Sequence, residues 1–260
     1  MSVPNRRESA ALLLSLDPPK WHLRHSRAVA ETAGWLALRA HSAGRSLDRR
    51  LVEAASLLHD VDKLERVKPL VAGLAHAEGS AAYLASRGYP ELGPAIVGHP
   101  VTRLADAEWF EAWMASAPPE ALIVAYADKR AGQRVESMAD RFASWEHRYP
   151  PAERAGRARG SWSAGTLAAV QHRAEEIERR VCRLADVEPG EVTRLAWTSR
   201  AFADARSLDA ATGAAPSHSL CRRPRRSATT GATTPTASTT LRTGWPCASP
   251  TAVPRWSASA

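Results

Sequence analysis

Hydrophobic residues recur at intervals of three and four positions from Trp21 to about Asp186, which is the period of an amphipathic α-helix. In residues 25–44, "HSRAVAETAGWLALRAHSAG", the apolar residues at positions 29, 33, 36 and 40 share one helix face. Residues 46–64, "SLDRRLVEAASLLHDVDKL", start at a serine that suits an N-cap and carry a second apolar face. No segment alternates apolar and polar residues as a half-buried strand does. The pattern therefore predicts an all-α fold, a helical bundle.

The same spacing, together with proline and glycine at the segment ends, predicts further helices. We expect a short helix before Pro18-Pro19 and others within residues 75–88, 89–99, 106–117, 119–135 and 164–187.

Composition divides the chain into four parts. We expect residues 1–19 to form an N-terminal helix and lead-in, residues 20–150 the main domain, and residues 151–206 a helical extension that packs on the bundle. Residues 207–260 are rich in Ala, Ser, Thr, Pro, Gly and Arg without periodicity, which predicts a disordered, low-complexity basic tail. Out-of-frame translation of a GC-rich gene produces a similar change, so the sequence leaves open whether the tail is native.

The positive charge is concentrated in this tail. The chain has a net charge of +8, and residues 210–260 hold six arginines and no acidic residue, so residues 1–209 carry 8 − 6 = +2. A nearly neutral main domain argues against a long nucleic acid as its partner. The tail's "CRRPRR" could bind nucleic acid or a membrane surface, but so short a basic run is a weak signal.

Membrane insertion and disulfide scaffolds are not indicated. The longest apolar runs, residues 10–14 and 121–127, are far below the roughly 20 residues that a bilayer requires. The three cysteines, Cys182, Cys221 and Cys247, show neither metal-binding spacing nor the number that a disulfide framework requires. We therefore expect no membrane partner and a cytoplasmic location.

Six imidazole and carboxylate groups lie beside apolar helical stretches, each near a predicted helix end: His25, His59, Asp60, His76, His99 and Asp128. Burying such groups costs free energy unless a partner satisfies them. Helices of a bundle could bring the six to one place, where nitrogen and oxygen donors suit a divalent transition metal or magnesium. For the His59-Asp60 pair alone, ordinary hydrogen bonding is as good an explanation. We expect such bonding for His22 and simple packing for Trp109 and Trp113.

The order of these groups resembles the HD-domain metal-dependent phosphohydrolase superfamily over residues 21–150. The matching pieces are "RHSRAVAETA" (24–33), "LLHDVDK" (57–63) and "YADKR" (126–130). The family often has glycine where this chain has Asp62, and Lys63 follows as in many members. We expect Asp62 to be an exposed extra carboxylate whose charge bears on metal preference.

Residues 75–100, "AHAEGSAAYLASRGYPELGPAIVGHP", extend the resemblance to two-metal members, which include the bacterial diadenosine tetraphosphate hydrolases. The resemblance implies that His25, His59, Asp60 and Asp128 bind a first metal. It also implies that His76 and His99 bind a second one, with Asp60 bridging the two. One of these two histidines could instead bind phosphate. The sequence does not decide between one metal and two, nor among Mn, Fe, Mg, Co and Ni.

The resemblance further implies hydrolysis of a phosphoester or phosphoanhydride by a metal-activated water. Asp60 and Lys63 would be catalytic, and Lys63, Lys129 and Arg130 would bind a small phosphorylated substrate, for which we expect a nucleotide. Two alternatives stay open: a non-catalytic or regulatory helical module with a structural metal, and a nucleic-acid-associated protein that binds through its tail. The oligomeric state cannot be inferred from the sequence.

Overall fold

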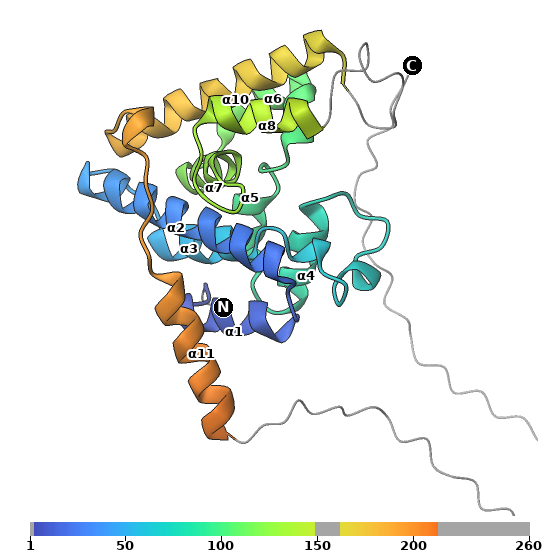
Figure 1. Ribbon diagram of the computed structural model, residues 1–260, viewed down its shortest axis with the longest axis vertical. Helices are drawn as coiled ribbons and strands as arrows, with labels where there is room; N and C mark the ends of the chain where they lie inside the picture. Colours follow the sequence, from blue (N-terminus) through green and yellow to red (C-terminus); the bar gives the residue numbers. More distant parts are fainter. Residues whose placement is uncertain (1–2, 149–161, 213–260) are drawn as a thin grey trace, which may run out of the picture. The chain divides into compact units, whose positions relative to one another are not determined.

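The computed structural model describes residues 3–148 and 162–212, and every regular element in these ranges is a helix. The only strand-like pairing in the described ranges is an isolated bridge between Ala131 and Val135. The prediction of an all-α fold is therefore confirmed (Figure 1).

The α-helices are α1 (Arg6–Ser15), α2 (Lys20–Ser42), α3 (Arg49–Leu58), α4 (Glu78–Ser86), α5 (Gly93–Ile96), α6 (Ala107–Ser116), α7 (Pro119–Arg130), α8 (Met138–Arg148), α10 (Ala164–Ala185) and α11 (Thr198–Thr212). Short 3₁₀ turns connect several of them: η1 (Val61–Lys63), η2 (Lys68–Leu70), η3 (Pro90–Leu92), η4 (Val101–Ala105) and η5 (Pro189–Glu191).

Local chemistry explains where the main helices start. Asn5 and Glu8 form a reciprocal capping box at α1, in which the Asn5 side chain accepts from the Glu8 N–H and the Glu8 side chain accepts from the Asn5 N–H. Asp48, rather than the predicted Ser46, caps α3 by accepting from the N–H groups of Arg50 and Leu51.

Helix α7 lies at the centre of the fold. It packs against α2, α3, α5, α8 and α10, and every residue from Ala121 to Ala127 is buried. A helix that is enclosed on several sides is apolar around its circumference, which explains why its sequence reads as a continuous apolar run. Helices α2, α3 and α7 also pack against one another, so the ends of these three helices define one region of the core.

The segment after residue 162 packs on this core. Helix α10 contacts α7 and α2 through a buried face of Val170, Ala174, Ile177 and Val181. The chain then runs along α2, where the Trp197 indole N–H donates to the Ala30 carbonyl at 3.2 Å, and α11 packs on α1.

Helix α11 continues to Thr212, so residues 207–212, which were predicted to belong to the disordered tail, are helical. Buried Ala201, Phe202 and Ala205 anchor the first part of this helix. The predicted disordered tail from residue 213 onward lies outside the described residues. Two of the three cysteines are in that part of the chain, and Cys182 is a free, buried thiol.

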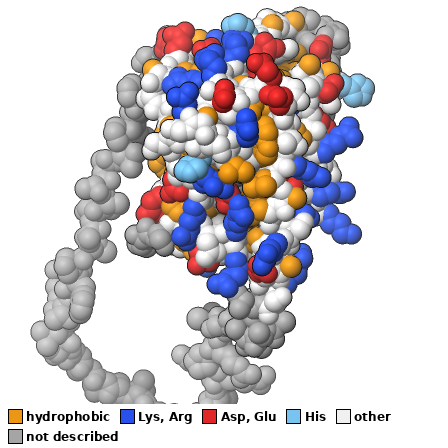
Figure 2. Space-filling view, turned by 90° about the vertical axis from the view of Figure 1, so that its left-hand side faces the viewer, with side chains coloured by type: hydrophobic (Ala, Val, Ile, Leu, Met, Phe, Trp, Pro, Cys, Tyr) orange, Lys and Arg blue, Asp and Glu red, His pale blue; other side chains and the backbone are white. Residues whose placement is uncertain are grey.

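The surface carries charges of both signs. On the face shown in Figure 2, Lys and Arg side chains are interspersed with Asp and Glu. Within the described ranges, no helix combines the length and the apolar composition that crossing a membrane requires.

The chain after α5 is packed tightly against α6. Trp109 and Trp113 stack with their ring centroids 5.5 Å apart, which agrees with the packing role predicted for them. A Cβ atom at Gly98 would lie 2.5 Å from the Trp113 ring, a distance that real Cβ atoms essentially never show. Only glycine therefore allows this close approach, one residue before His99.

We predict that Gly98→Ala lowers the free energy of unfolding by about 1–3 kcal/mol, because the added methyl group forces Trp113 and the backbone apart. Urea denaturation would measure the change. The control is Gly190→Ala, since a Cβ there meets no atom within 4 Å. Equal stability of Gly98→Ala and the parent chain would contradict this account of the packing.

Candidate metal centre

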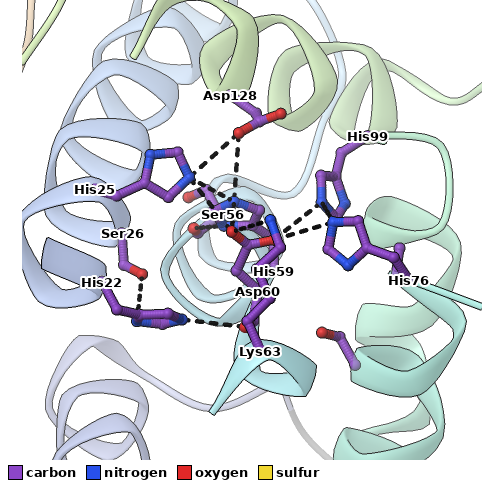
Figure 3. Close-up of polar contacts among 12 residues, drawn as sticks. His22, His25, Ser26, Ser56, His59, Asp60, Lys63, His76, His99 and Asp128 are labelled. Atoms are coloured by element: carbon purple, nitrogen blue, oxygen red, sulfur yellow. Dashed lines mark hydrogen bonds and ion pairs between the residues drawn. The ribbon is translucent and has the colours of Figure 1, made fainter. Parts of the chain in front are cut away.

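Five separate stretches of chain bring the six predicted groups together (Figure 3). The groups are His25 in the second turn of α2, His59 and Asp60 directly after α3, His76 before α4, His99 after α5, and Asp128 in the last turn of α7. Because the helix ends meet at the core formed by α2, α3 and α7, side chains far apart in the sequence converge there.

One set of donors surrounds the Oδ2 atom of Asp60. His25 Nε2 lies 3.2 Å from His59 Nε2, 3.5 Å from Asp60 Oδ2 and 3.3 Å from Asp128 Oδ1. His59 Nε2 lies 3.5 Å from each of the same two carboxylate oxygens. Four donor atoms thus face one another across similar short distances.

A second set surrounds the other oxygen of the same carboxylate. Asp60 Oδ1 lies 3.3 Å from His76 Nε2 and 3.3 Å from His99 Nε2, and these two nitrogens are 3.2 Å apart. The two oxygens of Asp60 therefore point into two different donor sets, which is the arrangement of a bridging carboxylate.

The histidines are held so that Nε2 faces the centre. The Nδ1 atoms of His25, His59 and His99 each lie 2.8 Å from a backbone carbonyl, those of Gly132, Ser56 and Ile96 respectively. A carbonyl can only accept, so each Nδ1 carries the proton and donates it. In a neutral ring the Nε2 lone pair is then directed at the other donors, which is how proteins prepare imidazole for a metal.

This donor set fits a divalent cation. An ion about 2.1 Å from each donor would separate neighbouring donors by roughly 3.0–3.5 Å, for octahedral to tetrahedral angles. The measured separations of 3.2–3.5 Å agree with that range. Three overlapping groups that could hold a metal occur here: His25, His59 and Asp128; His59, Asp60 and His99; and Asp60, Asp62 and His76.

The electrostatics of the metal-free chain show how strongly the carboxylates require positive charge. Burial by itself lowers the pKa of His25, but the Asp128 and Asp60 carboxylates outweigh it and raise that pKa to about 10. Burial would raise the pKa of Asp60 and of Asp128, yet the surrounding histidines hold both well below their usual range. Burial lowers the pKa of His99 to about 4, so that ring is neutral. In the metal-free chain, the proton on His25 therefore supplies the positive charge that a bound cation would supply at the same place.

Asp62 is not the exposed carboxylate that the sequence suggested. Its side chain is 8% exposed, and its Oδ2 accepts from His76 Nδ1 at 2.9 Å and from the Ala77 N–H at 2.9 Å. Ala77 has a φ of +72°, a costly conformation for a residue other than glycine, and Asp62 holds it in place. The Asp62 carboxylate therefore orients the ring of His76, as carboxylates behind metal-bound histidines do.

Lys63 lies at the centre, with Nζ 2.8 Å from Asp60 Oδ2. Burial lowers its pKa, but the Asp60 and Asp128 carboxylates outweigh burial and raise it, so the ammonium group stays charged. Its side chain is 43% exposed and lines two cavities that open beside the donor sets.

Lys129 and Arg130, by contrast, do not face these cavities, which corrects the expectation that they contact substrate. Lys129 is fully buried, and its Nζ donates to the carbonyls of His99 and Ala125 at 2.7 and 3.3 Å. Arg130 donates to the Tyr126 hydroxyl, Glu178 and two backbone carbonyls on the far side of α7. Both side chains bind neighbouring segments of the protein and are therefore not directed at the cavities. Consecutive residues of a helix point in different directions, so their position next to Asp128 does not place them beside it.

His22 makes the ordinary hydrogen bonds predicted for it, and one of them reaches the backbone of Asp60. It is fully buried, and its Nε2 lies 3.1 Å from the backbone carbonyl of Asp60 while its Nδ1 lies 3.3 Å from Ser26 Oγ. One turn before His25 on α2, it therefore supports the backbone that carries the Asp60 carboxylate.

A cavity of about 360 Å³ opens beside the donor sets. Part of its lining comes from Pro100, Val101 and Thr102, which directly follow His99. Four further lining residues were missed by the sequence reasoning: Arg141, Trp145, Trp162 and Leu167. The available signal was the spacing of four between Arg141 and Trp145, which places both on one side of a helix.

Comparison with known proteins agrees with this geometry. No curated protein and no solved structure matches the chain. Residues 23–132 match the family described as "HD domain", and this segment contains all six donors and Lys63. Residues 23–132 are thus similar to an HD domain, and this similarity supports the resemblance of the chain to the HD-domain superfamily.

Proposed function

We propose that this chain is a metal-dependent phosphohydrolase that cleaves a phosphoester or phosphoanhydride bond of a small phosphorylated substrate, for which we expect a nucleotide. The observation that carries the proposal is the inward orientation of four Nε2 atoms, each on a ring held through Nδ1, together with two carboxylates beside a cavity. The match of this segment to the HD domain supports the same reaction class.

The proposed ligands are those expected from the sequence. His25, His59, Asp60 and Asp128 would hold one divalent metal, and His76, His99 and Asp60 a second. A metal bound there supplies Lewis acidity toward phosphoryl oxygens and lowers the pKa of a bound water toward neutrality. The separate use of Oδ1 and Oδ2 by Asp60 supports the two-metal arrangement of the bacterial diadenosine tetraphosphate hydrolases that the sequence resembles. The donors are compatible with Mn, Fe, Mg, Co or Ni.

The protein groups have separable tasks in this proposal. Asp60 stays ionised and is held by Lys63 at 2.8 Å, so the carboxylate is oriented between the two donor sets. The charged end of Lys63 also reaches the cavity, where it can donate to a phosphoryl oxygen and stabilise the negative charge that develops there. His76, with 33% of its side chain exposed, lies where a substrate would enter.

Composition supports two further parts of the proposal. The charge of +2 over residues 1–209 argues against long nucleic acid as the substrate of this domain. The buried free thiol of Cys182 is compatible with a cytoplasmic location, which we also propose. Binding of nucleic acid through the basic tail concerns residues outside the described ranges.

Metal binding should release a proton from His25. Because the pKa of His25 is raised to about 10 in the metal-free chain, metal binding at neutral pH must displace its proton. Apparent Mn²⁺ affinity should therefore rise about tenfold per pH unit from about pH 6.5 to 8.5. Calorimetry in buffers of different ionisation enthalpy would count the released protons. His41→Gln, an exposed histidine in α2, should keep the same slope, and a pH-independent affinity would exclude His25 as a ligand.

Removing the charge of Asp62 should weaken metal binding at the second donor set. Replacing it with asparagine removes the negative charge behind His76 Nδ1, so affinity at the second donor set should fall roughly 10–100-fold. The first equivalent of metal should bind as before, as measured by calorimetric titration and metal analysis. Glu65→Gln, whose carboxylate is 87% exposed, is the control. Equal loss at both equivalents would contradict a specific role in orienting His76.

The third prediction tests the reaction. Asp60→Ala should reduce metal-dependent phosphate release from a panel of nucleotides to the level of the metal-free protein, with the far-ultraviolet circular dichroism preserved. Asp17→Ala, at an 83% exposed carboxylate, should change neither quantity.

The proposed enzyme would be contradicted if no nucleotide released phosphate with Mn, Fe, Mg, Co or Ni bound. If the metal nevertheless raised the melting temperature of the parent chain, the alternative of a non-catalytic module with a structural metal would be favoured.

A further inference from the structure

The cavity beside the donor sets has a second side that a phosphate group does not require. Arg141 and Trp145 from α8, Trp162 just before α10, and Leu167 from α10 form this side, which we call the α8–α10 wall. All four residues follow position 132, so the HD-domain match does not cover them. The cavity of about 360 Å³ falls within the roughly 300–1,000 Å³ range of small-ligand sites.

Within the described ranges, the Arg141 guanidinium has neither a hydrogen-bond acceptor nor a carboxylate partner. Its Nε atom is buried without a hydrogen bond. Two other side chains in the described ranges, Ser9 and Arg49, also have a buried polar atom without a partner, but neither lines a cavity described here. Arg141 lines both cavities beside the donor sets, in common with His25 and Lys63. A buried donor without an acceptor is costly, and a phosphate oxygen would satisfy it.

Trp145 lies next to this guanidinium and is fixed from behind. The Arg141 Cζ atom is 5.2 Å from the centroid of the Trp145 ring, and the Phe142 ring packs edge-on against Trp145 at 5.2 Å. Phe142 is buried, whereas Trp145 is half-buried and lines the cavity. Trp162, which is also half-buried, and Leu167 add apolar surface to the same wall. Fixed indole rings beside a cationic group offer stacking surfaces to an aromatic ring that carries a phosphate.

We propose that the α8–α10 wall is a binding site for the aromatic base of a nucleotide. In this arrangement Trp145 and Trp162 contact the base, Arg141 binds a phosphate oxygen, and that phosphate lies toward Lys63 and the donor sets. The proposal rests on the proposed function for the direction in which the phosphate points, and it names the substrate class as nucleotides over phosphate esters without an aromatic ring.

The first test compares two ligands that share a ribose 5-phosphate group and differ in the base. Calorimetry with the full, Mn²⁺-loaded chain should show AMP binding at least tenfold more tightly than ribose 5-phosphate. Trp145→Ala should remove most of this difference and leave the dissociation constant of ribose 5-phosphate within twofold. Trp145→Phe should keep most of the preference, because an aromatic face remains.

The second test separates the charge of Arg141 from the ring. Arg141→Met should weaken the binding of AMP and of ribose 5-phosphate by a similar factor of about ten, since both ligands carry the phosphate. Two variants serve as matched controls: Arg200→Met, at a side chain 90% exposed on α11, and Trp35→Phe, at a tryptophan of α2 outside the cavity. Neither should change the binding of either ligand.

Three results would overturn the base site. The first is equal affinity of the parent chain for AMP and ribose 5-phosphate. The others are an equal loss of affinity for both ligands in Trp145→Ala, or an unchanged preference for AMP in that variant. Melting temperatures and circular dichroism identify a variant that fails to fold, and Trp145→Phe then decides. If AMP is preferred as expected but no nucleotide is hydrolysed, the base site stands and the proposed hydrolase fails. If phosphate is released equally well from AMP and ribose 5-phosphate and affinity shows no preference, the hydrolase stands and the base site fails.

Discussion

The buried carboxylate of Asp60 is the group around which the rest of the site is arranged. Its side chain is 2% exposed, and it stays ionised because histidines and Lys63 surround it. A buried charge that lacks compensation costs on the order of several kcal/mol, so the fold must surround the carboxylate with positive charge and hydrogen-bond donors. His25 and His59 face one oxygen, and His76 and His99 face the other. A pair of divalent cations would compensate the same charge more completely than protons do.

The backbone takes part in this arrangement as much as the side chains do. Three histidines are tethered through Nδ1 to carbonyls, and the Lys129 ammonium donates to the carbonyl of His99 itself. Gly98, the residue before His99, can approach the Trp113 ring closely because it has no side chain. Burial of these supports in the core makes the donor geometry a property of the fold, so a cation would bind to donors that are already oriented.

The surroundings of the site divide into two kinds of surface. The donors and Lys63 come from the segment that matches the HD domain, and in the proposed function they bind the phosphate group. The α8–α10 wall comes from later segments and combines indole rings with a guanidinium that has no carboxylate partner among the described residues. In the proposed function, the reaction and the choice of substrate would therefore depend on different parts of the chain.

The all-α fold and the convergence of the six imidazole and carboxylate groups could be predicted from the sequence, for two physical reasons. Helical period is a local property that burial of one face imposes, and His59-Asp60 stands directly after an apolar helix, where either group needs a partner.

The sequence could not show where individual side chains point. Asp62 was expected to be exposed and instead holds His76 and Ala77, while Lys129 and Arg130 were expected at the substrate and instead bind carbonyls and Glu178. Nor could it place Arg141 and Trp145 in the cavity, because that depends on how α8 and α10 pack on α7. Local pattern determined which residues have the chemistry for a metal centre, whereas the tertiary packing decided which of them face it.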